Sequence, residues 1–454
     1  MATIQDPTQD RTDNHEFSTI GMRRLLLKYG LPGALGMLMA GMQGIIDGFF
    51  IGRFVGSDAL AAVSIAMPAY SAIIAVCVIV GVGAMTVMGM SQGSGDMSRA
   101  NDALRSSTIF LVLFSVIASA LLVVFADSIL QLMGADATLI DQSVTYLSYL
   151  TPFFPAIALT FMGDYYLRAL GRPLQGLFLI ATTIVTNIML DYLLIAHFDL
   201  GVRGAAFATG SSFLVTMLVT LYFMFQSKNE LNLRKGTFRW RLLGRMAYNG
   251  SSEGVSELSG GYTQLVFNLA MMRYLGSDGV AAISAVNYII VMVILVNVGI
   301  SNGLVPVIAY AYGAQKFDRV KSVFTSNVLV SSSVGLAFGL SLFFASEHII
   351  GLFFDGAESA VITVAQSGSK IIALSMMFTG INIAISNFFT AIGDAFSSVI
   401  VAALRGLIFI TIGINTLPLL FDTNGIWMTI PFTEIATVIV ACAMVWRHYK
   451  VTAG

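Results

Sequence analysis

A nine-residue segment of this chain occurs twice, half a chain apart, and this duplication constrains the fold more than any other feature. The sequence Gly-Ser-Asp-Ala-Leu-Ala-Ala-Val-Ser at 56–64 returns as Gly-Ser-Asp-Gly-Val-Ala-Ala-Ile-Ser at 276–284. Further matching segments follow in the same order, 81–93 with 299–313 and 167–171 with 389–393. Because order and orientation are both kept, the pattern predicts two parallel repeats, each with an even number of membrane spans.

The composition places these repeats in a membrane. Apolar residues make up 56% of the 454 residues and charged residues only 11%, whereas soluble domains carry about 25% charged residues. The pattern predicts an all-α integral membrane protein with about 12 transmembrane helices in two parallel-repeat six-helix lobes around a central cavity. The predicted spans lie near 25–50, 60–90, 106–126, 142–168, 174–196, 204–226, 243–272, 280–312, 323–345, 361–390, 396–420 and 424–446.

The basic residues indicate which helix ends face the cytoplasm. With both termini inside, the tails and the even-numbered loops hold about 20 of the 24 Lys and Arg residues, as the positive-inside rule requires. The longest basic loop, 228–245, is then a topology signal, because a net charge of −1 gives no reason to expect nucleic acid. We expect five parts: an N-terminal tail 1–24, an N-lobe 25–227, a linker 228–242, a C-lobe 243–447 and a C-terminal tail 448–454.

Two spans of the N-lobe carry acidic side chains, which are costly at bilayer depth and usually face a cavity. Asp47 follows Gln43 by one helical turn in the first span, among glycines that allow the helix to bend. Asn187 and Asp191 lie four residues apart in the fifth span and so share one helix face, and Thr209 begins the sixth span. Such oxygens can hold Na⁺ or a proton, although an acid near water at a helix end is the alternative.

The C-lobe carries a second acidic pair. Glu253 and Glu257 lie one turn apart in the seventh span on a small and polar face, which lines a cavity or packs closely against another helix. Alternatively, one of the two glutamates is simply a charged residue at the cytoplasmic end of this span. The remaining candidates are three amides that line the same pathway or bond neighbouring helices, and one pair that suits a local ion pair or a gate: Gln264, Asn287, Asn382, and Asp164 with Arg168.

Three motifs, taken in order, give the chain a resemblance to a known family. Asp47 is followed by Phe-Ile-Gly-Arg-Phe-Val-Gly-Ser-Asp-Ala-Leu-Ala-Ala at 50–62, then by Arg-Ala-Leu-Gly-Arg-Pro at 168–173 and Asn-Ile-Met-Leu-Asp at 187–191. Each piece alone is weak, but together they resemble the multidrug and toxic compound extrusion (MATE) family over nearly the whole chain. The chain is similar to the prokaryotic branch of DNA-damage-inducible protein F.

The resemblance implies a transporter that alternates between inward-open and outward-open states and exports lipophilic, mostly cationic drugs or toxic metabolites in exchange for H⁺ or Na⁺. It implies a bacterial cytoplasmic (inner) membrane protein, a monomer in contact with membrane lipids, with no cofactor besides the coupling ion. The coupling site, or a Na⁺ site, falls by resemblance on Asp47, Asn187, Asp191 and Thr209. Either Glu253 or Glu257 resembles a seventh-span acid of another branch, but the span near 361–390 lacks the acid which that branch uses there.

The repeat predicts that the two lobes are unequal. Transferred through the repeat offset, Asp47 falls opposite Phe267 and Glu253 opposite Gly33, so the acids were not duplicated with the scaffold. We therefore expect the cation site in the first lobe. Ionised Asp47 and Asp191 would favour a cationic drug, and H⁺ or Na⁺ entering from outside would remove that preference. Bending of the first span at its glycines would then push the drug outward.

Three other classes of function have less support. A flippase for a lipid-linked sugar or a phospholipid needs several basic residues in the cavity, and only Lys370 and Arg405 are candidates. A membrane enzyme needs paired acids or His ligands, but the four histidines fall in the tail, in loops or beyond the last span. No His-Glu-x-x-His or Gly-x-x-x-x-Gly-Lys-Ser/Thr motif occurs. A channel needs a short filter-like loop. We expect a transporter without enzyme activity and without a nucleic-acid partner.

Overall fold

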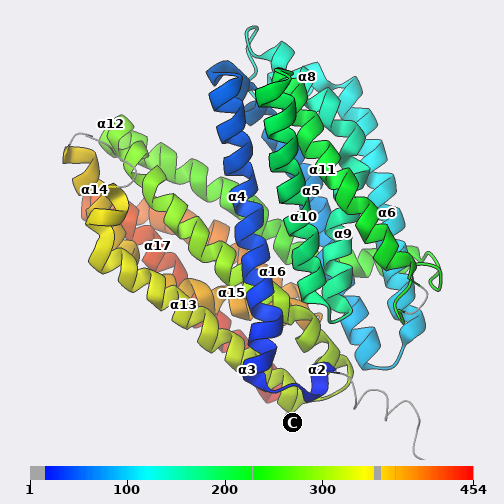
Figure 1. Cartoon of the computed structure of the whole chain (residues 1–454). Helices are drawn as coiled ribbons and strands as arrows, with labels where there is room; N and C mark the ends of the chain where they lie inside the picture. Colours follow the sequence, from blue (N-terminus) through cyan, green and yellow to red (C-terminus); the bar gives the residue numbers. More distant parts are fainter. Residues whose placement is uncertain (1–15, 227–228, 352–358, 374, 453–454) are drawn as a thin grey trace, which may run out of the picture. The chain divides into compact units, whose positions relative to one another are not determined.

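The computed structural model describes residues 16–226, 229–351, 359–373 and 375–452, and every regular element within them is a helix (Figure 1). Contacts divide the chain into two units, which we treat separately. The first unit holds Leu35–Gly250, Ala309–Gln315 and the segment ending at Thr19, and the second holds Ile20–Ala34, Ser251–Ile308 and the segment from Lys316 onward.

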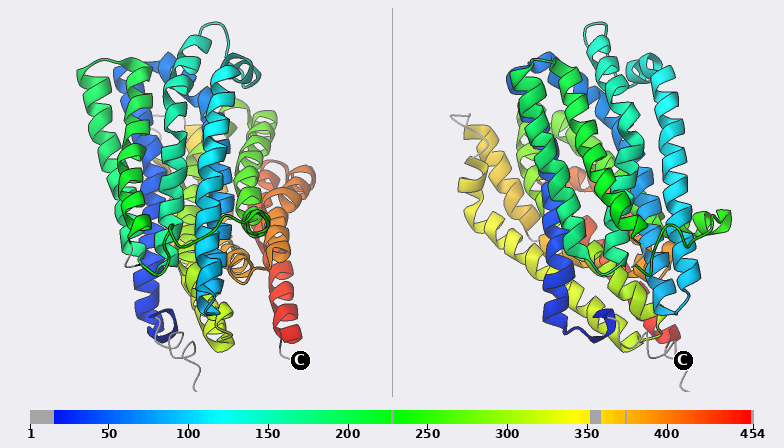
Figure 2. Two further views of the ribbon diagram at one scale, coloured as in Figure 1. Left: turned by 90° about the vertical axis from the view of Figure 1, so that its right-hand side faces the viewer. Right: turned by 45° about the vertical axis from the view of Figure 1, so that its right-hand side comes forward.

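Within the first unit, long helices run side by side. Helix α5 packs against α6, α8 and α9, and α11 packs against α8, α9 and α10 (Figure 2). The elements are α2 Glu16–Thr19, α4 Leu31–Phe54 from Leu35 onward, α5 Ser57–Gly93, α6 Met97–Val124, α7 Ala126–Leu132, α8 Ile140–Leu150, η2 Thr151–Phe153, α9 Phe154–Ala169, α10 Pro173–Asp191, η3 Tyr192–His197 and α11 Gly201–Phe225. The first turns of α12, as far as Gly250, and its end from Ala309 complete this unit.

In the second unit, α13 packs against α14 and α15, and α17 packs against α14, α15 and α16. Its buried core includes Trp427, Phe267 and Met376. The elements are α3 Met22–Leu25, η1 Leu26–Gly30, α12 Trp240–Gly313, α13 Phe317–Gly351, α14 Ser359–Ala373, α15 Met376–Ala391, α16 Ala395–Ala403, η4 Leu404–Ile408 and α17 Phe409–Thr452.

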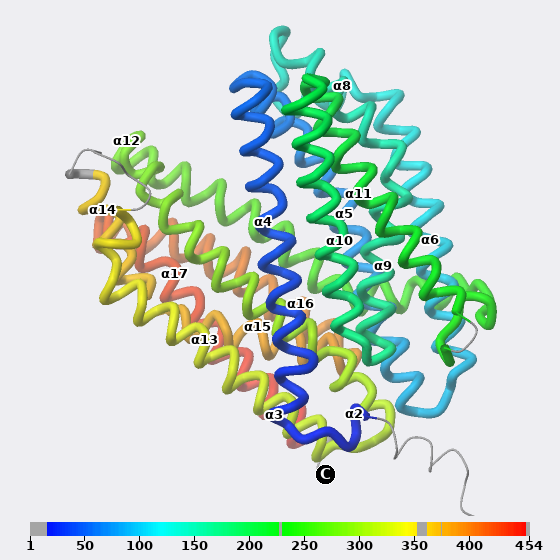
Figure 3. The backbone as a smooth tube through the Cα atoms, in the orientation of Figure 1, coloured from blue at the N-terminus to red at the C-terminus, as the bar shows by residue number. Residues whose placement is uncertain are grey.

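The described helices provide the twelve predicted spans. Nine are long and apolar enough to cross a membrane, and α14 with α15 makes a tenth. Two of these contain a backbone break and hold two spans each, because α12 is broken at Gly276 and the stretch ending in α17 is broken at Asp422. Figure 3 shows the backbone of α12 turning back on itself. The predicted all-α fold with twelve spans is confirmed.

The turns between spans recur at the repeat offset. Gly56 and Gly276, which open the duplicated motif, have φ of 126° and 64°, and Gly171 and Gly393 have φ of 74° and 78°. Glycine adopts positive φ without a steric cost, which explains why it stands at these turns in both halves. The duplication is therefore visible in the backbone as well as in the residues.

Contacts assign three segments, 20–34, 243–250 and 309–315, differently from the predicted parts, and close helix packing accounts for the first two. In the first unit, a methyl group on Gly83 of α5 would overlap the carbonyl oxygen of Met246, so the start of α12 belongs with α5. In the second unit, a methyl group on Gly303 would overlap the carbonyl oxygen of Tyr29, so the start of the first span belongs there. Glycine permits such backbone-to-backbone contact between membrane helices. Contacts thus place residues 20–34 in the second unit and residues 243–250 in the first.

We predict that Gly83→Ala destabilises the protein by about 1–3 kcal/mol, because the added methyl group has no space and overpacking costs this much. Gly44→Ala is the matched control, since a Cβ at Gly44 meets no atom within 4 Å. Thermal unfolding of the purified protein in detergent measures both variants. Equal unfolding midpoints for the two variants would contradict the close approach of α5 to α12.

Candidate functional site

Asp47, Asn187 and Asp191 come together inside the first unit from two helices. Asn187 and Asp191 occupy the last two turns of α10, where they are 0% and 1% exposed. Asp47 on α4 lies within side-chain interaction range of both, and the half-buried Gln43 lies one turn before it. The π-helix η3 (Tyr192–His197) follows Asp191 directly. Such π-turns are frequent at functional sites.

This cluster has buried polar atoms without a hydrogen-bond partner. They are Oδ1 of Asp47, Oδ2 of Asp191, and both Oδ1 and Nδ2 of Asn187. Buried polar atoms are normally paired, so these atoms need an explanation. The carboxylates of Asp47 and Asp191, which lie within interaction range of each other, also repel each other when both are charged. The arrangement is therefore suited to take up one cation, either H⁺ or Na⁺, between Asp47 and Asp191.

The available ligands limit what kind of ion could bind there. In the part of the chain that the structure describes, no group of three or more His, Cys, Asp or Glu side chains is arranged to hold a metal ion. A Na⁺ ion at the two acids would therefore depend on neutral oxygens, namely the Asn187 amide and the Thr209 hydroxyl. These hard oxygen ligands suit Na⁺ as well as carboxylates do. A transition metal, which prefers nitrogen or sulfur ligands, does not fit this set.

Two tyrosines belong to the same cluster and were not found from the sequence. Tyr146 on α8 is 3% exposed, lies within hydrogen-bonding range of the Thr209 side chain on α11, and interacts electrostatically with both acids. Tyr70 on α5 lies close to Asp47. The sequence contains no signal for this grouping, because the tyrosines come from separate helices and only packing brings them to the acids.

The predicted pair of the fourth span forms an ion pair within the first unit. Nη2 of Arg168 lies 2.8 Å from Oδ2 of Asp164, and its Nε donates to Oδ1 at 3.0 Å. Arg168 is 6% exposed. A Cβ on Gly176 of α10 would lie 2.5 Å from Oδ1 of Asp164, so glycine makes room for the pair. The two charges neutralise each other inside the helical bundle, and a role as a gate stays a prediction.

The acidic pair of the seventh span lies in the second unit. Glu253 on α12 is half-buried and Glu257 is exposed, and the two carboxylates are close enough to repel each other. Further along α12, Nδ2 of Asn287 donates to Oε1 of Gln264 at 2.7 Å, and Nε2 of Gln264 donates to Oδ1 of Asn268 at 3.1 Å. These amides link the two arms of α12 on either side of its break. Their part in a substrate pathway stays a prediction.

Asn382 belongs to a buried polar network of the second unit. Its Nδ2 donates to Oε2 of Glu434 at 2.7 Å and to the Glu434 backbone oxygen at 2.9 Å. Nε of Arg405, in the π-helix η4, lies 2.9 Å from Oε1 of the same carboxylate. The burial of Glu434, which is 5% exposed, could not be judged from the sequence. The charge of Arg405 is therefore already matched, which leaves the flippase alternative with Lys370, an exposed residue of α14.

A duplicated bundle of membrane-spanning helices that buries acidic side chains is typical of secondary transporters. The MatE family model matches residues 32–193 and 261–415, one stretch in each half of the chain. The chain belongs to the MatE family. The resemblance found in the motifs is thereby confirmed.

Named relatives and solved structures agree with this assignment. The multidrug export protein MepA of Staphylococcus aureus (strain N315) is 25% identical over 425 residues, which cover 93% of this chain and 93% of that protein. A crystal structure of MATE in the straight conformation matches with a TM-score of 0.88 at 21% identity, covering 96% of this chain and 98% of the other. A second, in the bent conformation, matches with a TM-score of 0.87 at 21% identity, covering 99% and 98%.

We predict that Arg405→Met destabilises the protein by about 3–5 kcal/mol, because it leaves the Glu434 carboxylate buried without its cation. The double variant Arg405→Met, Glu434→Met should recover most of this loss, since apolar side chains of similar size replace a buried ion pair at little cost. Thermal unfolding in detergent measures both. A double variant less stable than the single one would contradict the view that the pair is structural.

Proposed function

We propose that this protein is a secondary active multidrug efflux antiporter, which exports lipophilic, mostly cationic compounds in exchange for H⁺ or Na⁺ by alternating access. The observation that carries the proposal is the pair of acids Asp47 and Asp191, which face each other among buried, unpartnered polar atoms. The similarity to a multidrug export protein of Staphylococcus aureus supports the same function. Export by this route is transport and requires no enzymatic reaction.

Competition for negative charge explains how such a site couples two fluxes. When Asp47 and Asp191 are unoccupied by a coupling ion, their charge favours a cationic compound in the same unit. An H⁺ or Na⁺ that binds between them removes this charge and with it the preference for the drug. A ligand shifts the equilibrium between the inward-open and outward-open states only by the difference in its affinity for the two. For the drug, the loss of negative charge at the two acids supplies a difference of this kind.

The first span is suited to transmit the binding event. It runs continuously over 22–54 and contains the π-helix η1 (Leu26–Gly30), and Asp47 lies in its last two turns. Residues up to Ala34 belong to the second unit and residues from Leu35 to the first. A bend in this helix would therefore change both units. Solved MATE structures in bent and in straight conformations support a bending step.

The apolar helices and the distribution of basic residues support a location in the cytoplasmic membrane. The chain is a multi-pass membrane protein by the length and apolarity of its helices. We place it in the bacterial cytoplasmic (inner) membrane with both termini in the cytoplasm, because about 20 of its 24 Lys and Arg residues then lie inside. We further propose that it works as a monomer in contact with membrane lipids, as the resemblance to the family implies.

We predict that Asp47→Asn and Asp191→Asn each lower the initial rate of drug export at least about tenfold, because an amide cannot take up a proton and carries no negative charge; tenfold corresponds to 1.4 kcal/mol. The control is Asp58→Asn, which changes an exposed acid of the same unit. Resistance and dye efflux are measured in a bacterium that lacks its own efflux pumps, with membrane levels of each variant matched. Normal export by both site variants would disprove the coupling site.

We predict that an imposed ion gradient drives export by the purified protein in vesicles, and that Asp191→Asn abolishes this driving force. A pH gradient is applied with and without Na⁺, and a Na⁺ gradient is applied at equal pH. Export that follows the pH gradient in the complete absence of Na⁺ identifies H⁺ as the coupling ion, whereas export that needs Na⁺ identifies Na⁺. Export at the same rate without either gradient would contradict antiport.

A further inference from the structure

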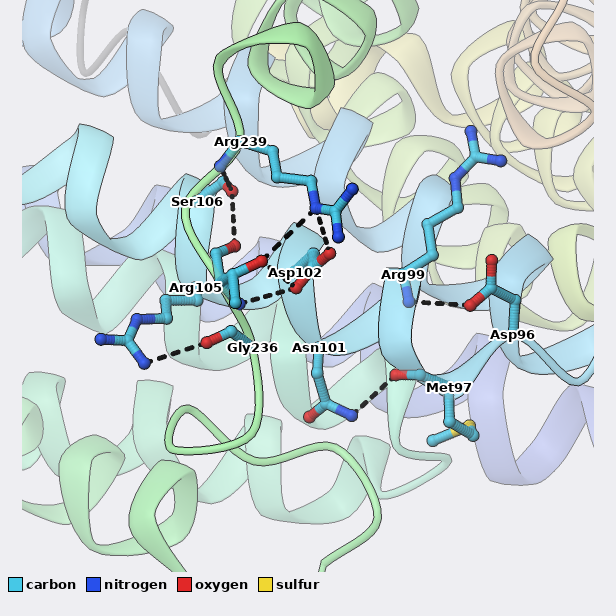
Figure 4. A network of polar contacts seen from close by, with 10 residues as sticks. Asp96, Met97, Arg99, Asn101, Asp102, Arg105, Ser106, Gly236 and Arg239 are labelled. Atoms are coloured by element: carbon cyan, nitrogen blue, oxygen red, sulfur yellow. Dashed lines mark hydrogen bonds and ion pairs between the residues drawn. The ribbon is translucent and has the colours of Figure 1, made fainter.

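The linker between α11 and α12 is held against the start of α6 (Figure 4). Oδ1 of Asn101 accepts a hydrogen bond from the backbone N–H of Asn232 at 2.7 Å, and Nη1 of Arg105 donates to the carbonyl oxygen of Gly236 at 2.9 Å. The side chain of Ser106 accepts from the backbone N–H of Arg239 at 2.9 Å. Successive turns of one helix thus hold the basic loop in a defined path.

Asp102 is the centre of this attachment. Its Oδ1 accepts hydrogen bonds from the backbone N–H of Thr237 at 2.6 Å and from the Thr237 hydroxyl at 2.9 Å, and its Oδ2 pairs with Nε of Arg239. Asp102 is 4% exposed, so its charge is used within the protein. The consequence is that the backbone at the start of α12 is fixed beside the start of α6.

A pocket of about 560 Å³ lies where these two helix starts meet. Four arginines line it, together with the two acids Asp96 and Asp102 and the side chain of Trp240; the arginines are Arg99, Arg239, Arg241 and Arg245. Of the acids, Asp102 pairs with Arg239, and Asp96 accepts a hydrogen bond from the backbone N–H of Arg99. The pocket therefore carries two more positive than negative charges, from elements more than 130 residues apart in the sequence.

Three of these arginines have no acidic partner. Arg239 pairs with Asp102, whereas in the part of the chain that the structure describes no acid lies at ion-pair distance from Arg99, Arg241 or Arg245. Figure 4 shows the guanidinium of Arg99 directed away from Asp96. The positive-inside rule requires basic residues in this loop, but it does not require that they gather in one pocket. Their convergence points to an anionic ligand.

The surroundings of the pocket indicate which anion fits. No side chain caps the start of α12, so the positive end of its helix dipole adds to the arginines. Trp240 is 70% exposed and stacks edge-on against Phe238, with 4.9 Å between ring centroids. Exposed tryptophan beside arginine at the end of a membrane span is typical of the boundary between lipid tails and water. A ligand that is anionic at one end and apolar at the other matches both features.

We propose that this pocket binds the phosphate group of an anionic phospholipid from the cytoplasmic leaflet. Guanidinium groups bind phosphate oxygens through paired hydrogen bonds, which makes arginine suited to this task. The volume of about 560 Å³ lies within the range of roughly 300–1,000 Å³ that small-ligand pockets occupy. The lipid tail would lie along Trp240, and the bound headgroup would join the start of α6 to the start of α12.

The test uses the full-length protein, purified in mild detergent and stripped of lipid. Phosphatidylglycerol or phosphatidylcholine is then added, and native mass spectrometry measures how much of each lipid the protein binds. Glycerol phosphate is added as a soluble competitor without a lipid tail. The variant is Arg99→Gln, Arg245→Gln, which spares the Asp102 network that holds the linker. The matched control is Arg53→Gln, an exposed arginine of the same unit outside the pocket.

We expect the protein to prefer phosphatidylglycerol, and we expect the double variant to bind it about 25-fold more weakly, at about fivefold for each arginine near an anionic headgroup. Arg53→Gln should bind it like the unaltered protein. The proposal is overturned if the double variant binds phosphatidylglycerol normally, if Arg53→Gln weakens binding as much, or if phosphatidylcholine binds equally well. Displacement by equimolar glycerol phosphate would show that the pocket serves a soluble phosphate and would overturn the assignment to a lipid.

Discussion

A charged side chain is tolerated inside hydrocarbon only when an opposite charge or a polar cavity lies beside it, and this chain meets the requirement in two different ways. Arg168 and Arg405 each lie in a short ion pair with an acid, so their charges are cancelled where they stand. Asp47 and Asp191 instead face each other, and in the described part of the chain no basic side chain lies at ion-pair distance from them. The Asp164–Arg168 pair lies within one helix and the Arg405–Glu434 pair joins two. The facing acids, in the function proposed above, would leave negative charge for a ligand to neutralise.

In the part of the chain that the structure describes, three spans contain a π-helix, and two of these π-helices lie at the polar residues just described. Helix η3 begins immediately after Asp191, and η4 contains Arg405. The third, η1, interrupts the first span, which also carries Asp47. The wider turn of a π-helix changes which way the following side chains point and leaves helix hydrogen bonds easier to rearrange. The helix backbone is thus irregular in the spans that carry Asp47, Asp191 and Arg405.

The sequence was sufficient to predict the helices and their duplication, because both depend on local patterns. Glycines such as Gly56 and Gly276 mark turns in any context, and long apolar segments can only be helices in a membrane. The partners of polar residues were harder to predict. Helical periodicity shows that Asn187 and Asp191 share a face, but it cannot show that Tyr146 joins them from another helix. Glu434 looked ambiguous for the same reason, because its burial depends on where Arg405 packs.

The exchange of segments between the two units has a consequence for how the protein is made. The second unit includes residues 20–34, and the first unit includes residues 309–315, so each unit contains a piece encoded in the other half of the gene. The first unit cannot be complete when its own six spans have left the ribosome, since it still lacks a segment synthesised much later. Each unit therefore includes residues from both halves of the chain, so neither half on its own contains a whole unit.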